Sequence, residues 1–287
     1  MTRFAGRKRQ KDDGLPPVTP SMAKTGASRE FESHVLSVEP IMGDAVLLTV
    51  SAPPAVLARL QPGQFFNIVA RFSGSFDPLL RRPYSVYRAR RDTSTLTFLV
   101  RPFGRGSAWL AERLPGERVG MLGPLGNSFT IPDRAQRLLM IGGGVGVAPL
   151  VMLSDEATSE KLDVVFVMGA ANEWGLLAAS ELPDRVEYVV ATDDGSRGHR
   201  GLATEVVGDF VQWADQIYAC GPEPMYRTLR AVVDPLRINR RPSIQVSVER
   251  GMACGLGACL GCVVETTQGM IASCVKGPVF DLDEVVL

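Results

Sequence analysis

Histidine is almost absent from this chain, which has two histidines, His34 and His199, in 287 residues. Neither residue has the neighbours of a catalytic triad or of a histidine metal site, so we interpret both as structural or surface residues. Long hydrophobic runs are missing as well. The one long apolar stretch, Leu138 to Leu153, contains four glycines and Pro149 within 16 residues, which excludes a membrane-spanning helix.

The chain also lacks an excess of charge of either sign. Lysine and arginine number 31, as do aspartate and glutamate, so the formal net charge is zero. This balance argues against nucleic acid or an anionic membrane as the main partner. The N-terminus is basic, but no apolar segment follows it, which excludes a secretory signal. The composition of residues 1–29, rich in Lys, Arg, Pro, Ser and Gly, predicts a disordered tail.

Cysteine is sparse but clustered. Four of the five cysteines lie in one glycine-rich stretch with the spacing C-x4-C-x2-C-x11-C, namely Cys254, Cys259, Cys262 and Cys274. The first three match the plant-type ferredoxin run, whose thiolates hold a [2Fe–2S] cluster. A structural zinc site, which usually has two C-x2-C pairs where this chain has one, and unligated buried thiols are the alternatives. Thiols gathered in this way indicate a cytoplasmic redox protein rather than a disulfide-bonded one.

The hydrophobic pattern divides the chain into three parts. Over residues 30–134, short alternating strands separated by turns predict a closed antiparallel β-barrel, interrupted by one helix from Arg105. Over residues 135–240, buried strands alternate with helix-like segments, as in an α/β domain with a parallel sheet. A small C-terminal module with the cysteines follows over residues 241–287. The predicted fold is therefore a multidomain α+β protein.

Two segments of the α/β part suit a dinucleotide. IGGGVGVAPL (Ile141 to Leu150) joins a predicted strand to a predicted helix, and its glycines let phosphates approach the backbone at the helix N-terminus. The alternative is a glycine turn that only packs a helix against a sheet. Cys220, Gly221 and Pro222 follow the last predicted parallel strand, at the edge where open α/β sheets bind ligands. Cys220 alone is equally typical of a small buried residue.

Two segments of the barrel suit a flavin. In RRPYSV, an arginine can hold a pyrophosphate, an aromatic ring can stack on a flavin, and a hydroxyl can reach a ring nitrogen; these residues are Arg82, Pro83, Tyr84 and Ser85. Further along, a helix opens whose amides suit the same diphosphate, at Gly104, Gly106 and Ser107. Taken alone, the first motif is equally compatible with an exposed strand that binds nothing.

In this order the motifs resemble the ferredoxin–NADP reductase superfamily. With the cysteine module, the chain resembles the electron-transfer subunits of NAD-dependent, two-subunit dihydroorotate dehydrogenases, and VERGMACGLGACLGC is its most family-specific string. The resemblance implies that the barrel binds FAD, the α/β domain binds NAD(H), and a [2Fe–2S] cluster passes electrons to a separate FMN-containing catalytic subunit. It further implies a heterotetramer of two plus two chains that serves pyrimidine biosynthesis.

The resemblance also implies residue roles. It assigns the flavin to Arg82–Ser85 and to Gly104, Gly106 and Ser107, the nicotinamide dinucleotide to the two segments of the α/β part, and the cluster to the four cysteines. The dinucleotide residues are Gly142, Gly143, Gly144, Gly146, Cys220, Gly221 and Pro222. Asp193, at the end of the strand VEYVVAT, predicts NAD over NADP because a carboxylate repels a 2′-phosphate, although Arg197 and Arg200 are close in sequence.

Other functions remain open at this stage. The small subunits of NADH-dependent ferredoxin:NADP oxidoreductases and sulfhydrogenase-type diaphorases share all three modules. Some of these carry an aspartate at one ligand position, so four cysteines favour the dihydroorotate family. A stand-alone flavin reductase and a zinc-binding module are further alternatives. Uncharged residues around the cysteines (Met252, Ala253, Leu256, Ala258 and Leu260) predict a docking surface, unless they only pack the module onto the α/β domain.

Overall fold

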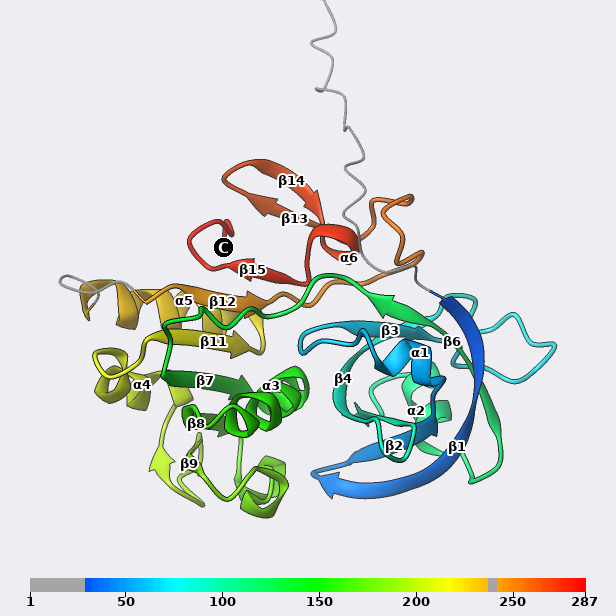
Figure 1. The fold of residues 1–287 in the computed structure, drawn as a ribbon, viewed down its shortest axis with the longest axis horizontal. Coiled ribbons are helices and arrows are strands. Elements are labelled where there is room, and N and C mark those ends of the chain that lie inside the picture. The colour runs from blue at the N-terminus through cyan, green and yellow to red at the C-terminus, as the bar shows by residue number, and fades with distance from the viewer. Residues whose placement is uncertain (1–28, 237–241) are drawn as a thin grey trace, which may run out of the picture.

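The computed structural model describes residues 29–236 and 242–287, so the predicted disordered tail lies outside the described residues apart from Arg29. Two bodies lie side by side, a barrel and a helix-covered sheet, and the C-terminal segment lies over both (Figure 1). Among the described residues, no helix combines the length and the apolar character needed to cross a membrane.

The barrel is closed by six antiparallel strands in the order β1-β2-β5-β4-β3-β6, as the alternating pattern predicts. Inward-facing residues such as Leu48, Phe66 and Phe98 are fully buried and form its core. Two short helices, α1 (Pro54–Leu57) and α2 (Arg105–Ala111), accompany the strands. The strands are β1 (Arg29–Met42), β2 (Ala45–Ser51), β3 (Phe65–Ile68), β4 (Arg82–Arg90), β5 (Thr95–Val100) and β6 (Arg118–Leu125).

The second body is a seven-stranded sheet in the order β10-β9-β8-β7-β11-β12-β15. All its pairs are parallel except the last, because β15 runs antiparallel to β12. The strands are β7 (Arg137–Gly143), β8 (Asp163–Ala170), β9 (Val186–Thr192), β10 (His199–Arg200), β11 (Gln216–Cys220), β12 (Ile244–Ser247) and β15 (Val279–Asp281).

Helices cover both faces of this sheet. Because successive side chains of a strand point to opposite faces, Leu138 and Met140 pack with α3, whereas Leu139 and Ile141 pack with α4 and α5. The helices are α3 (Ala148–Ser159), α4 (Ala203–Val211) and α5 (Glu223–Val233), with the short 3₁₀ turns η1 (Gly144–Val147), η2 (Glu173–Gly175), η3 (Ala179–Glu181) and η4 (Asp234–Leu236).

The C-terminal segment is attached to both bodies. Its strands β12 and β15 extend the sheet, and between them lie the hairpin β13 (Val263–Thr266) and β14 (Gly269–Ala272) and the short helix α6 (Ser273–Lys276). Residues 251–262, here called the cysteine loop, pack on the barrel together with Cys274 of α6. In that contact Met252, Cys262 and Cys274 meet Phe65 of β3 and Leu125 of β6.

Candidate functional site

A cleft of about 520 Å³ lies where the barrel, the sheet and the cysteine loop meet; we call it the central cleft. The barrel contributes the beginning of β4, the sheet contributes the turn after β7 and the end of β11, and residues 247–252 close the third side. Its lining includes Phe65, Pro83, Tyr84, Ser85, Val145, Gly146, Pro149, Cys220, Glu249, Arg250 and Met252. Five of the residues singled out in the sequence therefore share one cavity.

The predicted flavin residues lie on two adjoining segments of the barrel. Ser85 pairs with Phe65 across β3 and β4, which places both at the cleft. Burial raises the pKa of Tyr84 to about 12, against a smaller opposing effect of Arg82, so this phenol stays protonated at neutral pH. A Cβ atom on Gly106 would lie 3.3 Å from Arg82 Nε, so the two predicted diphosphate segments are in contact.

Helix α2 begins at the second of these segments. The Ser107 hydroxyl oxygen accepts hydrogen bonds from the backbone N–H groups of Phe103 and Gly104, at 2.8 and 2.9 Å. Ser107 thus caps its own helix, and its hydroxyl group is already engaged in that turn. The Arg82 guanidinium donates to the Leu80 carbonyl at 2.8 Å. Arg82, Gly104, Gly106 and Ser107 lie outside the lining of the central cleft.

The two predicted dinucleotide segments are packed tightly against each other. A Cβ atom on Gly146 would lie 2.5 Å from the Cys220 carbonyl oxygen, so no larger residue fits where the η1 turn meets the end of β11. A Cβ atom on Gly143 would similarly lie 3.1 Å from Pro222. Around Gly144, by contrast, nothing lies within 4 Å of the corresponding position. The close packing positions the open part of the turn at the carboxyl edge of the sheet.

Asp193 lies apart from the cleft, at an exposed turn after β9. The neighbouring Asp194 carboxylate accepts hydrogen bonds from the Ser196 hydroxyl at 2.6 Å and from its backbone N–H at 2.9 Å, and these bonds lower the pKa of Asp194. Arg200 packs on Gly195 of the same turn. The structure thus gathers two carboxylates and an arginine at the place that sequence reasoning associates with the adenosine ribose.

The four clustered cysteines lie near one another. Cys254 interacts with Cys259, and Cys274 interacts with Cys262 and, to a smaller extent, with Cys254. Backbone N–H groups point at the sulfurs: Leu256 N lies 3.3 Å from Cys254 Sγ, and Gly257 N lies 3.1 Å from Cys274 Sγ. In residues 29–236 and 242–287, no three histidine, cysteine, aspartate or glutamate side chains converge on a single ion. The four thiols are instead surrounded by backbone N–H donors.

The environment of Cys254 favours a thiolate. Burial opposes ionisation of its thiol, but the backbone N–H groups of Leu256, Cys259 and Ala258, together with the Cys259 side chain, outweigh burial and lower its pKa to about 6. Cys220 shows the opposite behaviour, because burial and the nearby Glu249 raise its pKa well above the ordinary thiol value. Cys220 is therefore a neutral thiol in the wall of the central cleft, separate from the four clustered cysteines.

Glu249 brings a carboxyl group to the cleft; it stands in the family-specific string VERGMACGLGACLGC, but nothing in the sequence assigned it a role. Glu249 is an exposed residue of the cleft lining, and partial burial raises the pKa of its carboxyl group. The one sequence feature that could have suggested a role for Glu249 is its position just before the cysteine loop.

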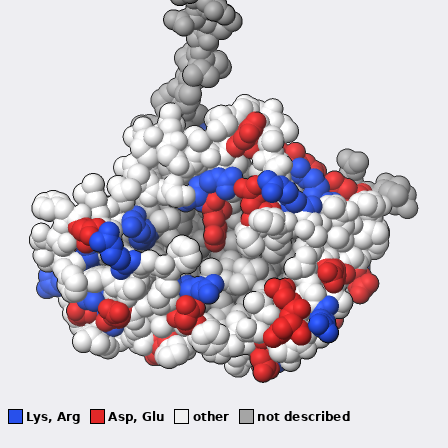
Figure 2. All heavy atoms as spheres, turned by 180° about the vertical axis from the view of Figure 1, so that it is seen from behind, with Lys and Arg blue, Asp and Glu red and all other residues white. Residues whose placement is uncertain are grey.

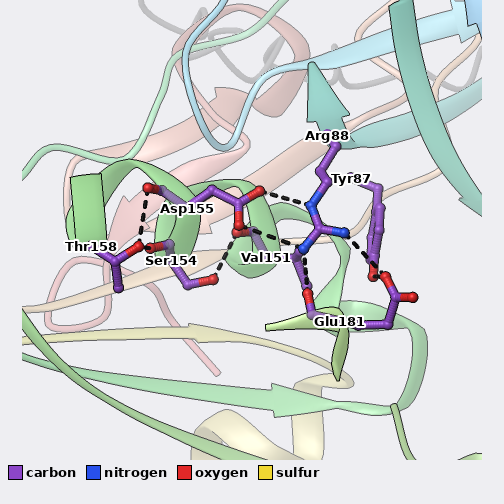
Figure 3. A network of polar contacts seen from close by, with 7 residues as sticks. All are labelled: Tyr87, Arg88, Val151, Ser154, Asp155, Thr158 and Glu181. Carbon is purple, nitrogen blue, oxygen red and sulfur yellow. Dashed lines mark hydrogen bonds and ion pairs between the residues drawn. The ribbon is translucent and has the colours of Figure 1, made fainter. Parts of the chain in front are cut away.

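An ion-pair network joins the barrel to the sheet domain beside the cleft. Arg88 of β4 donates to Asp155 of α3 at 2.8 Å and to Glu181 of η3 at 3.1 Å (Figure 3). The Tyr87 hydroxyl donates to the same Glu181 carboxylate at 2.9 Å. A more open groove of about 590 Å³ adjoins this network, but it contains none of the predicted site residues. The network therefore holds the two walls of the cleft together.

Charge is distributed unevenly over the surface. On the face opposite to that of Figure 1, acidic and basic side chains lie in small mixed groups around a hollow (Figure 2). In the cysteine loop, the residues from Gly251 to Cys262 include no charged side chain, and Leu256 and Leu260 are 58% and 49% exposed. The loop is thus an uncharged surface with two exposed leucines.

Comparisons with known proteins agree with this geometry. Residues 249–286 match a family model described as the iron-sulfur cluster binding domain of dihydroorotate dehydrogenase B, and residues 140–231 match the oxidoreductase NAD-binding domain. The dihydroorotate dehydrogenase B (NAD+) electron transfer subunit of Desulforamulus reducens is 36% identical over 267 residues, which cover 90% of this chain and 99% of that protein. The subunit of the same name from Bacillus caldolyticus is 40% identical over 79% of this chain and 87% of its own length.

Solved structures give the same picture of the fold. A structure titled as the NADH-dependent reduced ferredoxin-NADP oxidoreductase is similar over 88% of this chain and 89% of its own, with 25% identity and a TM-score of 0.76. A ferredoxin NADP+ reductase from Neisseria gonorrhoeae, with 19% identity and a TM-score of 0.58, shares the fold.

The barrel, the helix-covered sheet and the cysteine loop together define an electron-transfer oxidoreductase of the ferredoxin reductase type that carries an iron–sulfur binding module. Within this class the chain belongs to the family of dihydroorotate dehydrogenase B (NAD+) electron transfer subunits. The predicted family and fold class are thereby confirmed.

Proposed function

We propose that this chain relays electrons between NAD(H) and an FMN-containing dihydroorotate dehydrogenase catalytic subunit, through FAD and a [2Fe–2S] cluster. The observation that carries this proposal is the central cleft, where Tyr84 and Ser85 of the predicted flavin motif, Gly146 of the glycine turn and Met252 of the cysteine loop line one cavity. When bound, FAD accommodates one or two electrons and so links two-electron nicotinamide chemistry to the one-electron cluster. The protein's contribution is to position these groups against one another.

The residues at the cleft suit a flavin and a nicotinamide. Ser85 offers a hydroxyl group and Tyr84 a protonated phenol on one wall, while Gly146 and the neutral thiol of Cys220 leave room on the other. Arg82 and the start of α2 lie together at the place we assign to the FAD diphosphate. Residues Gly142–Gly146 and Cys220–Pro222 hold the nicotinamide dinucleotide, and Asp193 contacts its adenosine ribose.

The cysteine loop suits a two-iron cluster better than a single zinc ion. Together with Cys274 of α6 the loop supplies four thiols. We assign Cys254 and Cys259 to one iron and Cys262 and Cys274 to the other, because the stronger thiol interactions lie within these pairs. Backbone N–H groups aimed at sulfur stabilise thiolates, and the pKa of about 6 at Cys254 agrees with that. Gly255 has φ +73° and faces Asn67, so the loop closes over the barrel only with glycine at this position.

The partner docks on the uncharged cysteine loop. Leu256 and Leu260 are exposed beside two of the proposed ligands, and electron transfer requires the cluster to lie near its acceptor. We therefore place the catalytic subunit on this surface, in a heterotetramer of two plus two chains in the cytoplasm. A Leu256→Glu/Leu260→Glu variant should keep its cofactors but bind the partner at least tenfold more weakly, since each substitution places a charge in an apolar contact.

Reconstitution tests the proposal. The purified chain should reduce artificial dyes with NADH but should not oxidise dihydroorotate. Addition of the FMN-containing subunit should confer NAD-linked dihydroorotate oxidation in a stable complex. Rapid orotate formation by the isolated chain, or failure of the complete complex to couple dihydroorotate to NAD, would overturn it.

A second candidate rests on the structural similarity to the NADH-dependent ferredoxin-NADP oxidoreductase, which extends over 88% of this chain. In that case ferredoxin would replace dihydroorotate as the electron donor or acceptor. Assays of the complex that co-purifies with the tagged chain from its own cells distinguish the two, because only one of them oxidises dihydroorotate.

A further inference from the structure

Asn67 is a buried polar side chain without a partner. It lies in the middle of β3 and is 0% exposed, and neither its Nδ2 nor its Oδ1 atom has a hydrogen-bond partner among the described residues. Buried amides of native proteins are almost always hydrogen-bonded, so an exception calls for a ligand or a buried water. Three of the six buried unpaired side-chain atoms in the described residues belong to Asn67 and to Ser273, which precedes Cys274.

The strand geometry directs Asn67 away from the barrel core. Phe66 and Ile68 point inward and pack in that core, so Phe65 and Asn67, which alternate with them, point outward. On the outer face Phe65 packs with Cys262 and Cys274. The cysteine loop thus covers the face of β3 that carries Asn67.

The contact between Asn67 and the loop is close. A Cβ atom on Gly255 would lie 2.4 Å from Asn67 Nδ2, so the amide lies directly under the residue that follows Cys254. Cys254 is one of the cluster ligands in the proposed function. The side-chain amide of asparagine supplies two N–H donors, and thiolate and sulfide sulfurs are acceptors only.

We propose that the Asn67 amide donates a hydrogen bond to a sulfur of the cluster held by the cysteine loop and thereby raises the reduction potential of that cluster. The inference rests on the proposed function, which assigns the cluster to this loop. The added electron increases the negative charge on the sulfurs, so a donor stabilises the reduced state more than the oxidised state. Asn67 is a positioning and tuning residue that contributes no ligand to iron.

Removal of the donor tests this directly. In Asn67→Leu, which keeps the branched shape of the side chain but has no N–H donor, the ratio of reduced to oxidised cluster at a fixed solution potential should fall roughly tenfold, which corresponds to about 59 mV for one electron. The measurement is a redox titration of the iron-loaded chain, followed by the electron paramagnetic resonance signal of the reduced cluster. Thr204→Val is the matched control, because it removes another buried unpaired group, on α4, and should leave the ratio unchanged.

A second measurement detects the hydrogen bond itself, and a second variant is available in case the first does not fold. In the unaltered chain, exchange into deuterated water should shift the iron–sulfur stretching bands in the resonance Raman spectrum, and part of this shift should be absent in Asn67→Leu. If Asn67→Leu fails to fold, Asn67→Ala removes the same donor without adding bulk. Unchanged potential and unchanged deuterium shift in an iron-replete variant would overturn the proposal and assign the amide to a buried water. An unaltered chain that binds no iron would overturn the proposed function as well.

Discussion

Two of the barrel's contacts with the rest of the chain differ in their chemistry. Toward the sheet, beside apolar packing, the barrel presents Arg88, whose guanidinium bridges Asp155 and Glu181. Toward the cysteine loop it presents Phe65, Leu125 and the unpaired Asn67, and the facing residues are uncharged. The first contact is complete without any ligand, whereas the second keeps a polar group unsatisfied. We infer that the contact with the sheet holds the walls of the central cleft in place. In the contact with the loop, the bound cluster would supply the missing hydrogen-bond partner of Asn67.

Loss of a proposed ligand should have the largest effect, and it should be confined to the loop. Replacement of Cys254, Cys259, Cys262 or Cys274 by serine should abolish or strongly destabilise the cluster, because a harder oxygen ligand suits iron–sulfur centres poorly. Cys220→Ser should retain it, since this neutral buried thiol lies in the central cleft. Iron and sulfide analysis of the five variants checks the set. A full iron content in any of the four loop variants, or loss of iron in Cys220→Ser, would refute the assignment of the cluster ligands.

Gly255→Ala should weaken cluster binding without removing a ligand. Its φ of +73° disfavours a side chain, and the new Cβ atom would lie 2.4 Å from Asn67 Nδ2 and 2.9 Å from Leu125. We expect a cost of about 1–3 kcal/mol and correspondingly lower iron content after dilution with a chelator. Gly251→Ala is the matched control, because nothing lies within 4 Å of the added atom. Equal iron retention in the two variants would contradict this account of the loop.

Arg88→Ala should weaken the contact between the barrel and the sheet domain. It leaves two carboxylates without their cation in a partly buried site, and we expect a loss of about 1–2 kcal/mol in the free energy of unfolding. Reduction of FAD by NADH should slow, while iron content stays the same. Arg118→Ala, which removes an ion pair whose side chains are 65% and 70% exposed, should cost less than about 0.5 kcal/mol. A double-mutant cycle with Asp155→Ala measures the coupling, and a value near zero would show that the network does not hold the domains.

Asp193→Asn should have the smallest effect, on cofactor choice alone. Removal of one exposed carboxylate near the bound 2′-phosphate of NADPH changes the interaction by about 1 kcal/mol, so the ratio of NADPH to NADH efficiency should rise roughly fivefold. The neighbouring Asp194 is a poor substitute for the test because its carboxylate holds the turn through Ser196. Diaphorase assays with both cofactors provide the measurement, and an unchanged ratio would remove Asp193 from the specificity argument.

Local patterns predicted the parts of the molecule that are encoded in continuous segments. Each of these features lies within a short continuous segment, so composition and the alternation of apolar residues reveal it. They are the six strands of the barrel, the strand at Arg137–Gly143 and the cysteine spacing. Strand β15 was not predicted, because three residues carry too little pattern and it pairs antiparallel at the sheet edge.

Contacts between residues that are far apart in the chain could not be predicted from the sequence. Arg88 meets Asp155 and Glu181 across 67 and 93 residues, and nothing in the local sequence pairs them. Asn67 was missed for a different reason, since a single polar residue in a strand usually faces water. Only the packing of the cysteine loop on β3 shows that it is buried.

The most direct test of the account is anaerobic addition of NADH to the isolated chain loaded with FAD and iron, followed by optical and electron paramagnetic resonance spectroscopy. The account predicts that NADH bleaches the flavin and produces the signal of a reduced [2Fe–2S] cluster, and that Cys254→Ser bleaches without the signal. Bleaching of the flavin in the unaltered chain with a fully oxidised cluster would contradict the proposed relay.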